Sequence, residues 1–126
     1  MPELARLSLE SQGDIELARV AGEVDASNVA DLSQRLLAAV PNQARALVLD
    51  LSETSYIDSS GISLIFDAAA RLRNRHQELR LVVVPRSFVG EVLAAVSMER
   101  SVAIDPALDD ALRAVGDSES SDLEAG

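Results

Sequence analysis

The sequence predicts a single α/β domain built on a mixed, mostly parallel sheet. Two N-terminal segments alternate apolar and polar residues, which is typical of strands with one covered face. Two later segments are continuous apolar runs, as expected of central strands covered on both faces. From residue 46 onward these strands alternate with segments of helical periodicity, and this order implies right-handed crossovers between parallel strands.

The first half of the domain is expected to begin with a hairpin. Its two strands span residues 4–10 and 15–24, and turn-forming residues separate them. A helix is expected at 27–40, with Asp25 or Ser27 near its N-terminus. Its apolar face is formed by Val29, Leu32, Leu36 and Val40.

The second half is expected to alternate strands and helices. Strands are expected at 46–51, 79–84 and 101–104. Helices are expected from 58–60 to about 75, at 87–96, and at 106–115 with Pro106 in the first turn. The longest helix should bury one face, formed by Ile62, Ile65, Phe66, Ala69 and Leu72. Residues 116–126 are acidic and serine-rich, so we expect a domain at 1–115 and a disordered tail at 116–126.

The formal net charge of −10 limits the partners of this chain. Its surface would repel the phosphates of nucleic acids and anionic lipids, so any effect on transcription should pass through another protein. The sequence has no cysteine, so thiol chemistry is excluded and a zinc site is not expected. It has no apolar run of about eighteen residues and no signal-peptide pattern, so we expect a cytoplasmic protein without a membrane span.

The stretch Asp58-Ser59-Ser60-Gly61 is the clearest candidate for a functional site. It follows a strand-like segment and opens a helix, as Asp25 does after the second strand, so both should lie at the same end of the molecule. Aspartate and serine are also preferred helix caps, which explains them without any function. Capping does not explain Gly61, because glycine in a first helical turn costs about 1 kcal/mol relative to alanine. A packed neighbour or a docking partner close to the backbone would explain it.

An enzymatic role for these serines is not expected. The stretch is not the G-x-S-x-G motif of hydrolases, and a serine nucleophile needs a base. The only histidine, His76, lies at the far end of the same helix, more than about 20 Å away by helix geometry. The sequence has neither a glycine-rich phosphate loop nor metal-ligand spacing, so we predict no cofactor and no metal site.

A serine at a helix N-terminus can instead accept a phosphate, which the local amides and the helix dipole tolerate. In this context three stretches, GEVD, LVLDLSETSYIDSSGISLI and LRLVVV, resemble the STAS domains of the anti-sigma factor antagonist family. The resemblance covers roughly residues 4–115. It implies the STAS-type α/β fold, a mixed four- to five-stranded sheet packed with about four helices.

The resemblance also implies partner switching in bacterial transcription. In that family the unmodified antagonist binds an anti-sigma factor that is also a serine kinase, which frees a sigma factor. The kinase then phosphorylates the first serine of the motif, the complex separates, and a serine phosphatase of the metal-dependent type resets the cycle. By position this serine is Ser59, with Ser60 as the alternative, and the free protein is expected to be a monomer. The implied partner-binding residues are Asp25, Asp58, Ser59, Ser60, Gly61 and Ile62.

Two other functions stay open at the level of the sequence. One is a scaffold or adaptor subunit of a stress-signalling or lipid-transport complex, which does not require phosphorylation of Ser59. The other is a module that binds a small ligand or a nucleotide, which a thermal-shift screen would reveal.

Overall fold

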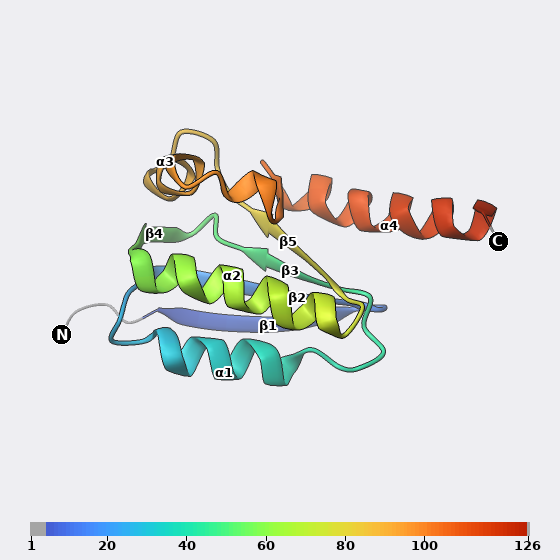
Figure 1. Ribbon diagram of the computed structural model, residues 1–126, viewed down its shortest axis with the longest axis horizontal. Helices are drawn as coiled ribbons and strands as arrows, with labels where there is room; N and C mark the ends of the chain where they lie inside the picture. The colour runs from blue at the N-terminus through green and yellow to red at the C-terminus, as the bar shows by residue number, and fades with distance from the viewer. Residues whose placement is uncertain (1–4, 126) are drawn as a thin grey trace.

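The computed structural model describes the backbone of residues 5–125 and the side chains of residues 5–116. This part of the chain forms six strands, four α-helices and one 3-10 turn (Figure 1). The strands are β1 (Arg6–Gln12), β2 (Ile15–Val24), β3 (Ala46–Asp50), β4 (Thr54–Ile57), β5 (Glu78–Val82) and β6 (Ala103–Asp105). The helices are α1 (Val29–Ala39), α2 (Ser59–Asn74), α3 (Phe88–Ala95) and α4 (Leu108–Ala125), and the 3-10 turn is η1 (Met98–Arg100).

The strands form one mixed sheet in the order β1-β2-β3-β5-β6, and β4 pairs with β2 outside this path. Strands β1 and β2 are antiparallel, as the predicted hairpin requires, and all other pairs are parallel. The mixed α/β class is therefore confirmed. The sheet has one strand more than the four or five expected. The additional strand is β4, which was not predicted because it has only four residues and shows no clear alternation of apolar and polar side chains.

Strand β2 is long enough to pair with two partners in succession. Its first half pairs with β3, and its last three residues pair with β4, with a register shift between Gly22 and Glu23 that leaves Ser55 of β4 as an extra residue. Gly22 has φ of +101°, a conformation that L side chains rarely adopt. The change of partner along β2 brings the end of β4 beside the end of β2.

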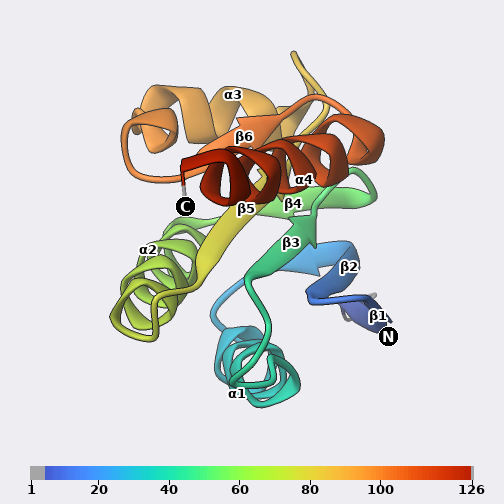
Figure 2. The same ribbon diagram turned by 90° about the vertical axis from the view of Figure 1, so that its right-hand side faces the viewer.

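Two aliphatic cores cover the two faces of the sheet. The larger core joins the sheet to α1, α2 and α3, and its fully buried side chains include Leu36, Leu49, Ile65 and Leu93. The smaller core lies under α4 and contains Leu17, Val48, Val82 and Val115. Figure 2 shows the sheet between α4 on one side and α1 and α2 on the other. Neither core contains an aromatic side chain.

The buried face of α2 differs from the expected one at Phe66. Ile65, Ala69 and Leu72 are buried and Ile62 is partly buried, as expected, but Phe66 is 38% exposed. The buried stripe of α2 also includes Gly61, Leu64 and Ala68. Because successive helical residues are separated by about 100°, Phe66 falls on the outer side of this stripe. The prediction that Phe66 is buried was wrong because it was based only on the apolar character of this side chain.

The C-terminal helix also differs from the expected one. It begins at Leu108 rather than in a turn containing Pro106, and it continues to Ala125, beyond the expected start of a tail at Gly116. Val115 is the last described buried side chain. The side chains of 117–126 lie outside the described residues, as does Leu4 of the first expected strand, so the domain boundary at 115 stays a prediction.

Candidate functional site

The ends of β2 and β4 place the two acidic segments side by side. Val24 and Ile57 are partners in the parallel pairing, and the amide of Asp58 donates a 3.3 Å hydrogen bond to the carbonyl oxygen of Val24. Asp25 and Asp58 are thus the next residues of two neighbouring strands. The expectation that both segments lie at the same end of the molecule is confirmed.

Asp58 caps α2 and leaves the next residue free. Its Oδ1 accepts hydrogen bonds from the amides of Ser60, at 2.9 Å, and Gly61, at 3.3 Å. Ser59 is the first residue of the helix, and its side chain is exposed and has no hydrogen-bond partner among the described residues. Ser60 is only partly exposed. The capping interpretation therefore holds for Asp58, while the Ser59 hydroxyl has no structural task.

Gly61 allows α2 to lie close against the strands. It is buried, and a Cβ atom there would overlap Cγ1 of Ile57 and come within 3.0 Å of Cγ1 of Val24. Ile57 and Val24 are themselves buried, so neither side chain can move aside freely. Of the two explanations offered for Gly61, a packed neighbour or a docking partner, the structure therefore shows the packed neighbour.

Asp25 is held in a tight polar turn before α1. Its Oδ1 accepts hydrogen bonds from the hydroxyl of Ser27, at 2.5 Å, and from the amide of Ser27, at 2.9 Å. These two bonds, the hydroxyl first, lower the pKa of Asp25 below its ordinary value. Asp25 is therefore a fixed negative charge at neutral pH.

Helix α1 does not use Asp25 or Ser27 as its N-cap. Its N-cap is Asn28, which makes no side-chain capping bond. The side chain of Asn28 instead reaches back, accepting from the amide of Asp25 and donating to the carbonyl oxygen of Glu23. The turn is therefore shaped to hold Asp25 next to the β4–α2 junction, and a helix-capping role for Asp25 is not observed.

Two aromatic side chains, of which only Tyr56 is predicted from the sequence to lie close to Ser59, are stacked beside β4. The rings of Tyr56, on β4, and Phe88, on α3, are stacked with centroids 5.5 Å apart and an angle of 14° between the planes. Tyr56 lies three residues before Ser59, and Figure 1 shows α3 next to β4, the strand that leads into α2. Because Tyr56 and Phe88 are distant in the sequence, their contact could not be predicted from a local sequence pattern.

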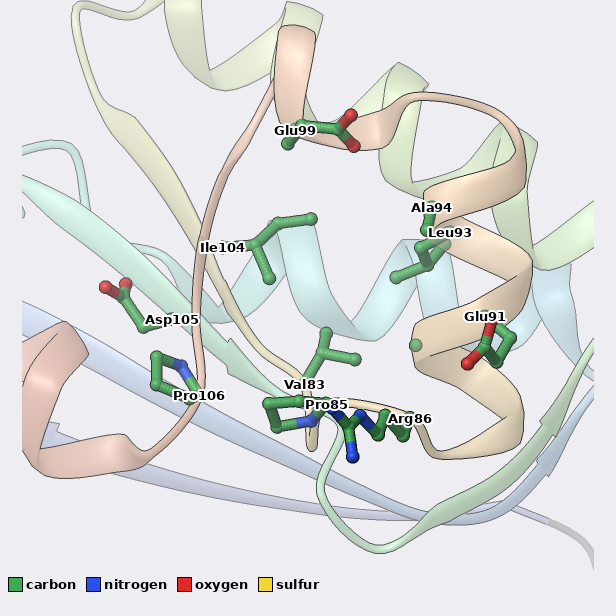
Figure 3. Close-up of a pocket in the computed structure, with 11 residues that line it drawn as sticks. Val83, Pro85, Arg86, Glu91, Leu93, Ala94, Glu99, Ile104, Asp105 and Pro106 are labelled. Carbon is green, nitrogen blue, oxygen red and sulfur yellow. The ribbon is translucent and has the colours of Figure 1, made fainter.

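A cavity of about 340 Å³ lies on another side of α3, between this helix and the segment from β6 to α4 (Figure 3). Its floor is apolar, with Val83, Leu93 and Ile104. Glu91, Glu99 and Arg86 lie at its rim without ion-pair partners among the described residues. With Asp105, which is paired with Arg80, three carboxylates line the cavity against the one guanidinium of Arg86, and this makes the cavity unfavourable for the phosphates of a nucleotide.

Two further features of the described residues limit what the site can do. No group of three or more His, Cys, Asp or Glu side chains among them is arranged to hold a metal ion. None of their helices combines the length and apolar character needed to cross a bilayer. The site around Ser59 consists of exposed hydroxyls, two carboxylates and aromatic rings, a set suited to contact with another protein.

Comparison with known proteins gives matches over most of the chain. The family described as Mlab, STAS domain matches residues 7–106. Anti-sigma-B factor antagonists of Listeria monocytogenes and Listeria innocua are each 37% identical over 62 residues, which is 49% of this chain and 54% of theirs. The chain thus aligns with about half the length of these curated relatives.

Solved structures share the fold at lower identity. An anti-sigma factor antagonist from Mycobacterium paratuberculosis superposes with a TM-score of 0.81 at 24% identity, covering 91% of this chain and 97% of that one. The Bacillus protein SpoIIAA in its phosphorylated form gives a TM-score of 0.63 at 18% identity, covering 87% of this chain and 99% of that one. These similarities concern the fold, and the match over residues 7–106 shows that the chain belongs to the STAS domain family.

Proposed function

We propose that this protein is an anti-sigma factor antagonist that binds an anti-sigma factor serine kinase and is released when Ser59 is phosphorylated. The observation that carries the proposal is the free, exposed Ser59 at the N-terminus of α2, beside Asp58 and Asp25. The names of the relatives from Listeria, Mycobacterium and Bacillus support the same function. The protein itself acts as substrate and ligand rather than as an enzyme.

The proposed reaction transfers the γ-phosphoryl group of ATP to the Oγ atom of Ser59. The hydroxyl loses its proton, ADP leaves, and the kinase supplies the catalytic groups. Because the Ser59 hydroxyl is exposed and has no partner among the described residues, no native contact has to be broken first. Ser60 is only partly exposed, so the exposed Ser59 is the better acceptor.

Phosphorylation would change the charge of this surface more than its shape. A phosphoserine carries about −1.5 to −2 charges at neutral pH. In the free protein, water and salt screen its repulsion from Asp58, and the helix N-terminus returns about 0.3–1 kcal/mol. The free, phosphorylated protein should therefore keep its fold.

The same charge would be poorly tolerated inside a docked complex. An interface excludes water, and two like charges about 6 Å apart at an effective dielectric constant near 20 repel by on the order of 3 kcal/mol. Since about 1.4 kcal/mol corresponds to a tenfold change in affinity, this repulsion is enough to separate the complex. The fixed negative charge of Asp25 adds to it. The difference between free and docked states therefore makes Ser59 a switch.

The decisive experiment combines the purified protein with ATP and each anti-sigma factor kinase encoded in its genome. Mass spectrometry should locate the phosphate on Ser59, and the phosphorylated form should no longer co-elute with that kinase. A protein that none of these kinases binds or phosphorylates would contradict the proposal. A metal-dependent serine phosphatase should restore binding.

An adaptor subunit of a larger complex is the second candidate function. It is favoured by the family match, because that family is defined by the STAS domain and not by a sigma factor. An adaptor would bind its partner equally well with Ser59 replaced by alanine or aspartate. An antagonist should bind with alanine and lose binding with aspartate, so this pair of variants separates the two functions.

A further inference from the structure

Helix α3 is apolar on nearly all sides although it lies on the surface. Its inner side buries Val89 and Leu93. Its outer side carries a second apolar stripe at helical spacing, formed by Phe88, Val92, Ala95 and, at the C-cap, Val96. A helix that is apolar all round is normally covered on both sides. Apart from the stack of Phe88 on Tyr56 and the partly buried Val92, this second stripe of α3 is exposed.

The aromatic residues of the chain add a second observation. The chain has one tyrosine and two phenylalanines, and all three are exposed: Tyr56 by 39%, Phe66 by 38% and Phe88 by 53%. Aromatic side chains usually contribute to a core, and on a surface they are enriched where proteins dock. Here the cores are aliphatic, and the aromatic residues are placed outside.

All three aromatic residues flank the proposed phosphorylation site. Tyr56 precedes Ser59 by three residues and stacks on Phe88. Phe66 follows Ser59 by seven residues, which is about two turns along the same outer side of α2. The stack connects α3 to β4, the strand that leads directly into Asp58 and Ser59.

We propose that this outer side of α3, with the ring of Tyr56, is part of the surface that docks on the anti-sigma factor kinase. We define this aromatic patch as Tyr56, Phe88, Val92, Ala95 and Val96. The inference rests on the proposed function and extends it, because none of these residues belongs to the acidic and serine motifs. The aromatic patch forms the apolar centre of the interface, and Ser59 lies at its margin, where a phosphate disturbs docking.

The charges around the aromatic patch define the surface that fits it. Asp25 and Asp58 follow the ends of β2 and β4. The exposed Glu91 lies three residues after Phe88 on α3, and the exposed Arg86 precedes Phe88 by two residues. The chain as a whole carries −10, so two copies meeting through this patch would bring like charges together. A partner with an apolar centre and basic side chains around it would bury the aromatic patch without this repulsion. The kinase is therefore expected to present such a surface.

The test uses the full chain and the kinase that phosphorylates it. Phe88→Ala removes the most exposed ring, and Ala95→Arg places a positive charge on the outer side of α3. Leu9→Ala is the matched control, since Leu9 is 44% exposed but lies on the edge strand β1. Circular dichroism and melting temperature would be recorded for each variant before binding is measured.

We expect Phe88→Ala to weaken binding of the unphosphorylated chain by about tenfold or more, as for a central interface residue, and Ala95→Arg to weaken it further. Leu9→Ala should change affinity by less than about threefold. If the wild-type chain binds its kinase while the folded Phe88→Ala and Ala95→Arg variants bind equally well, this inference is overturned and the proposed function survives. If the wild-type chain binds no kinase, both fail.

Two other results would assign the patch to a different occupant. A wild-type dimer in sedimentation analysis that Phe88→Ala dissociates would make the patch an interface between copies of this chain, and would overturn the inference. Binding of a small molecule that Phe88→Ala abolishes, with kinase affinity unchanged, would overturn it as well.

Discussion

The amide of Asp58 donates a hydrogen bond to the carbonyl oxygen of Val24, and this 3.3 Å contact joins the ends of β4 and β2. It fixes the first residue after one strand against the last residue of the other. Asp25 and Ser59 follow directly on either side of the bond. The site therefore depends on backbone pairing, which substitutions of its exposed side chains should leave intact.

Replacement of Ser59 by alanine should abolish phosphorylation with little effect on the fold. The Ser59 hydroxyl is exposed and has no hydrogen-bond partner in the described part of the chain, and Asp58 still caps α2, so the free energy of unfolding should change by less than about 0.5 kcal/mol. The variant should hold its kinase persistently and keep sigma-dependent genes active. The matched variant Ser60→Ala should still be phosphorylated. Phosphate found on Ser60 of the wild-type chain, with Ser59 unmodified, would overturn the assignment.

Replacement of Gly61 by alanine should destabilise the protein by about 1–3 kcal/mol, as expected for overpacking. The added Cβ would overlap Ile57 and crowd Val24, and the better helix propensity of alanine returns only about 1 kcal/mol. Gly116→Ala is the matched control, because a Cβ at Gly116 in α4 meets no atom within 4 Å. Chemical denaturation should show a loss for the first variant and none for the second.

The crowding at Gly61 can be tested further by removing its neighbour. Ile57→Ala alone should cost about 2–5 kcal/mol, because Ile57 is buried. Combined with Gly61→Ala it should cost less than the sum of the two, since the alanine at position 61 fills part of the space. Strictly additive effects would mean that the two residues do not compete for the same volume.

Asp25 should titrate below an ordinary aspartate. The hydroxyl and amide of Ser27 stabilise its charged form, so NMR should give a lowered pKa, and Ser27→Ala should raise it. Because the folded pKa is lowered, the stabilisation is complete above the unfolded pKa and is lost as the pH falls through the folded pKa. A pKa unchanged by Ser27→Ala would show that the hydroxyl does not bond Asp25 in solution.

Asp25→Asn also tests whether this charge serves docking. Its turn keeps the amide and carbonyl contacts of Asn28, so the melting temperature should fall little while affinity for the kinase drops. Unchanged affinity with a clear loss of stability would give Asp25 a purely structural role.

Deletion of residues 117–126 should change neither the melting temperature nor kinase binding by much. Val115 is the last described side chain in the core under α4, and the deleted segment is acidic with almost no apolar residues. Residues 117–125 extend the backbone of α4, but so few apolar side chains can add little to the core. A melting temperature lowered by several degrees would place the domain boundary beyond residue 116.

The sequence predicted the parts of the fold that depend on local pattern. The apolar runs located β3 and β5, and the strand–helix alternation gave the parallel part of the sheet. Adjacent placement of Asp25 and Asp58 followed from the rule that parallel strands share their carboxyl ends. Strand β4 was too short to show a period, and Phe66 was assigned to the buried side because it is apolar.

The aromatic patch could not be located from local pattern. The stack of Tyr56 on Phe88 depends on the crossover that brings α3 beside β4, which is a tertiary contact. One signal was available: α3 has only Glu91 as a polar side chain, which indicates a helix covered on both sides. The sequence could thus have shown that α3 has apolar side chains on both sides, but not that its exposed side lies next to the strand that leads to Ser59.

Tyr56 should report phosphorylation and docking through its fluorescence. It is the only tyrosine in a chain without tryptophan, and it lies on the surface three residues before Ser59 rather than in the core. A phosphate on Ser59 or a partner over the stacked rings changes the solvent and charge around the phenol, so its emission should change. Far-UV circular dichroism should stay almost constant, because the expected change is local.

The control for this signal is Phe88→Ala, which removes the ring stacked on Tyr56 and should change the emission of the unmodified protein. Because Phe88 is 53% exposed, its removal should leave the far-UV spectrum as it was. A large far-UV change on phosphorylation of the wild-type chain would contradict a switch based on local charge, since it would mean that helices or strands refold. An emission change with a constant spectrum supports the local switch, because only the surroundings of the Ser59 site then differ between the two forms.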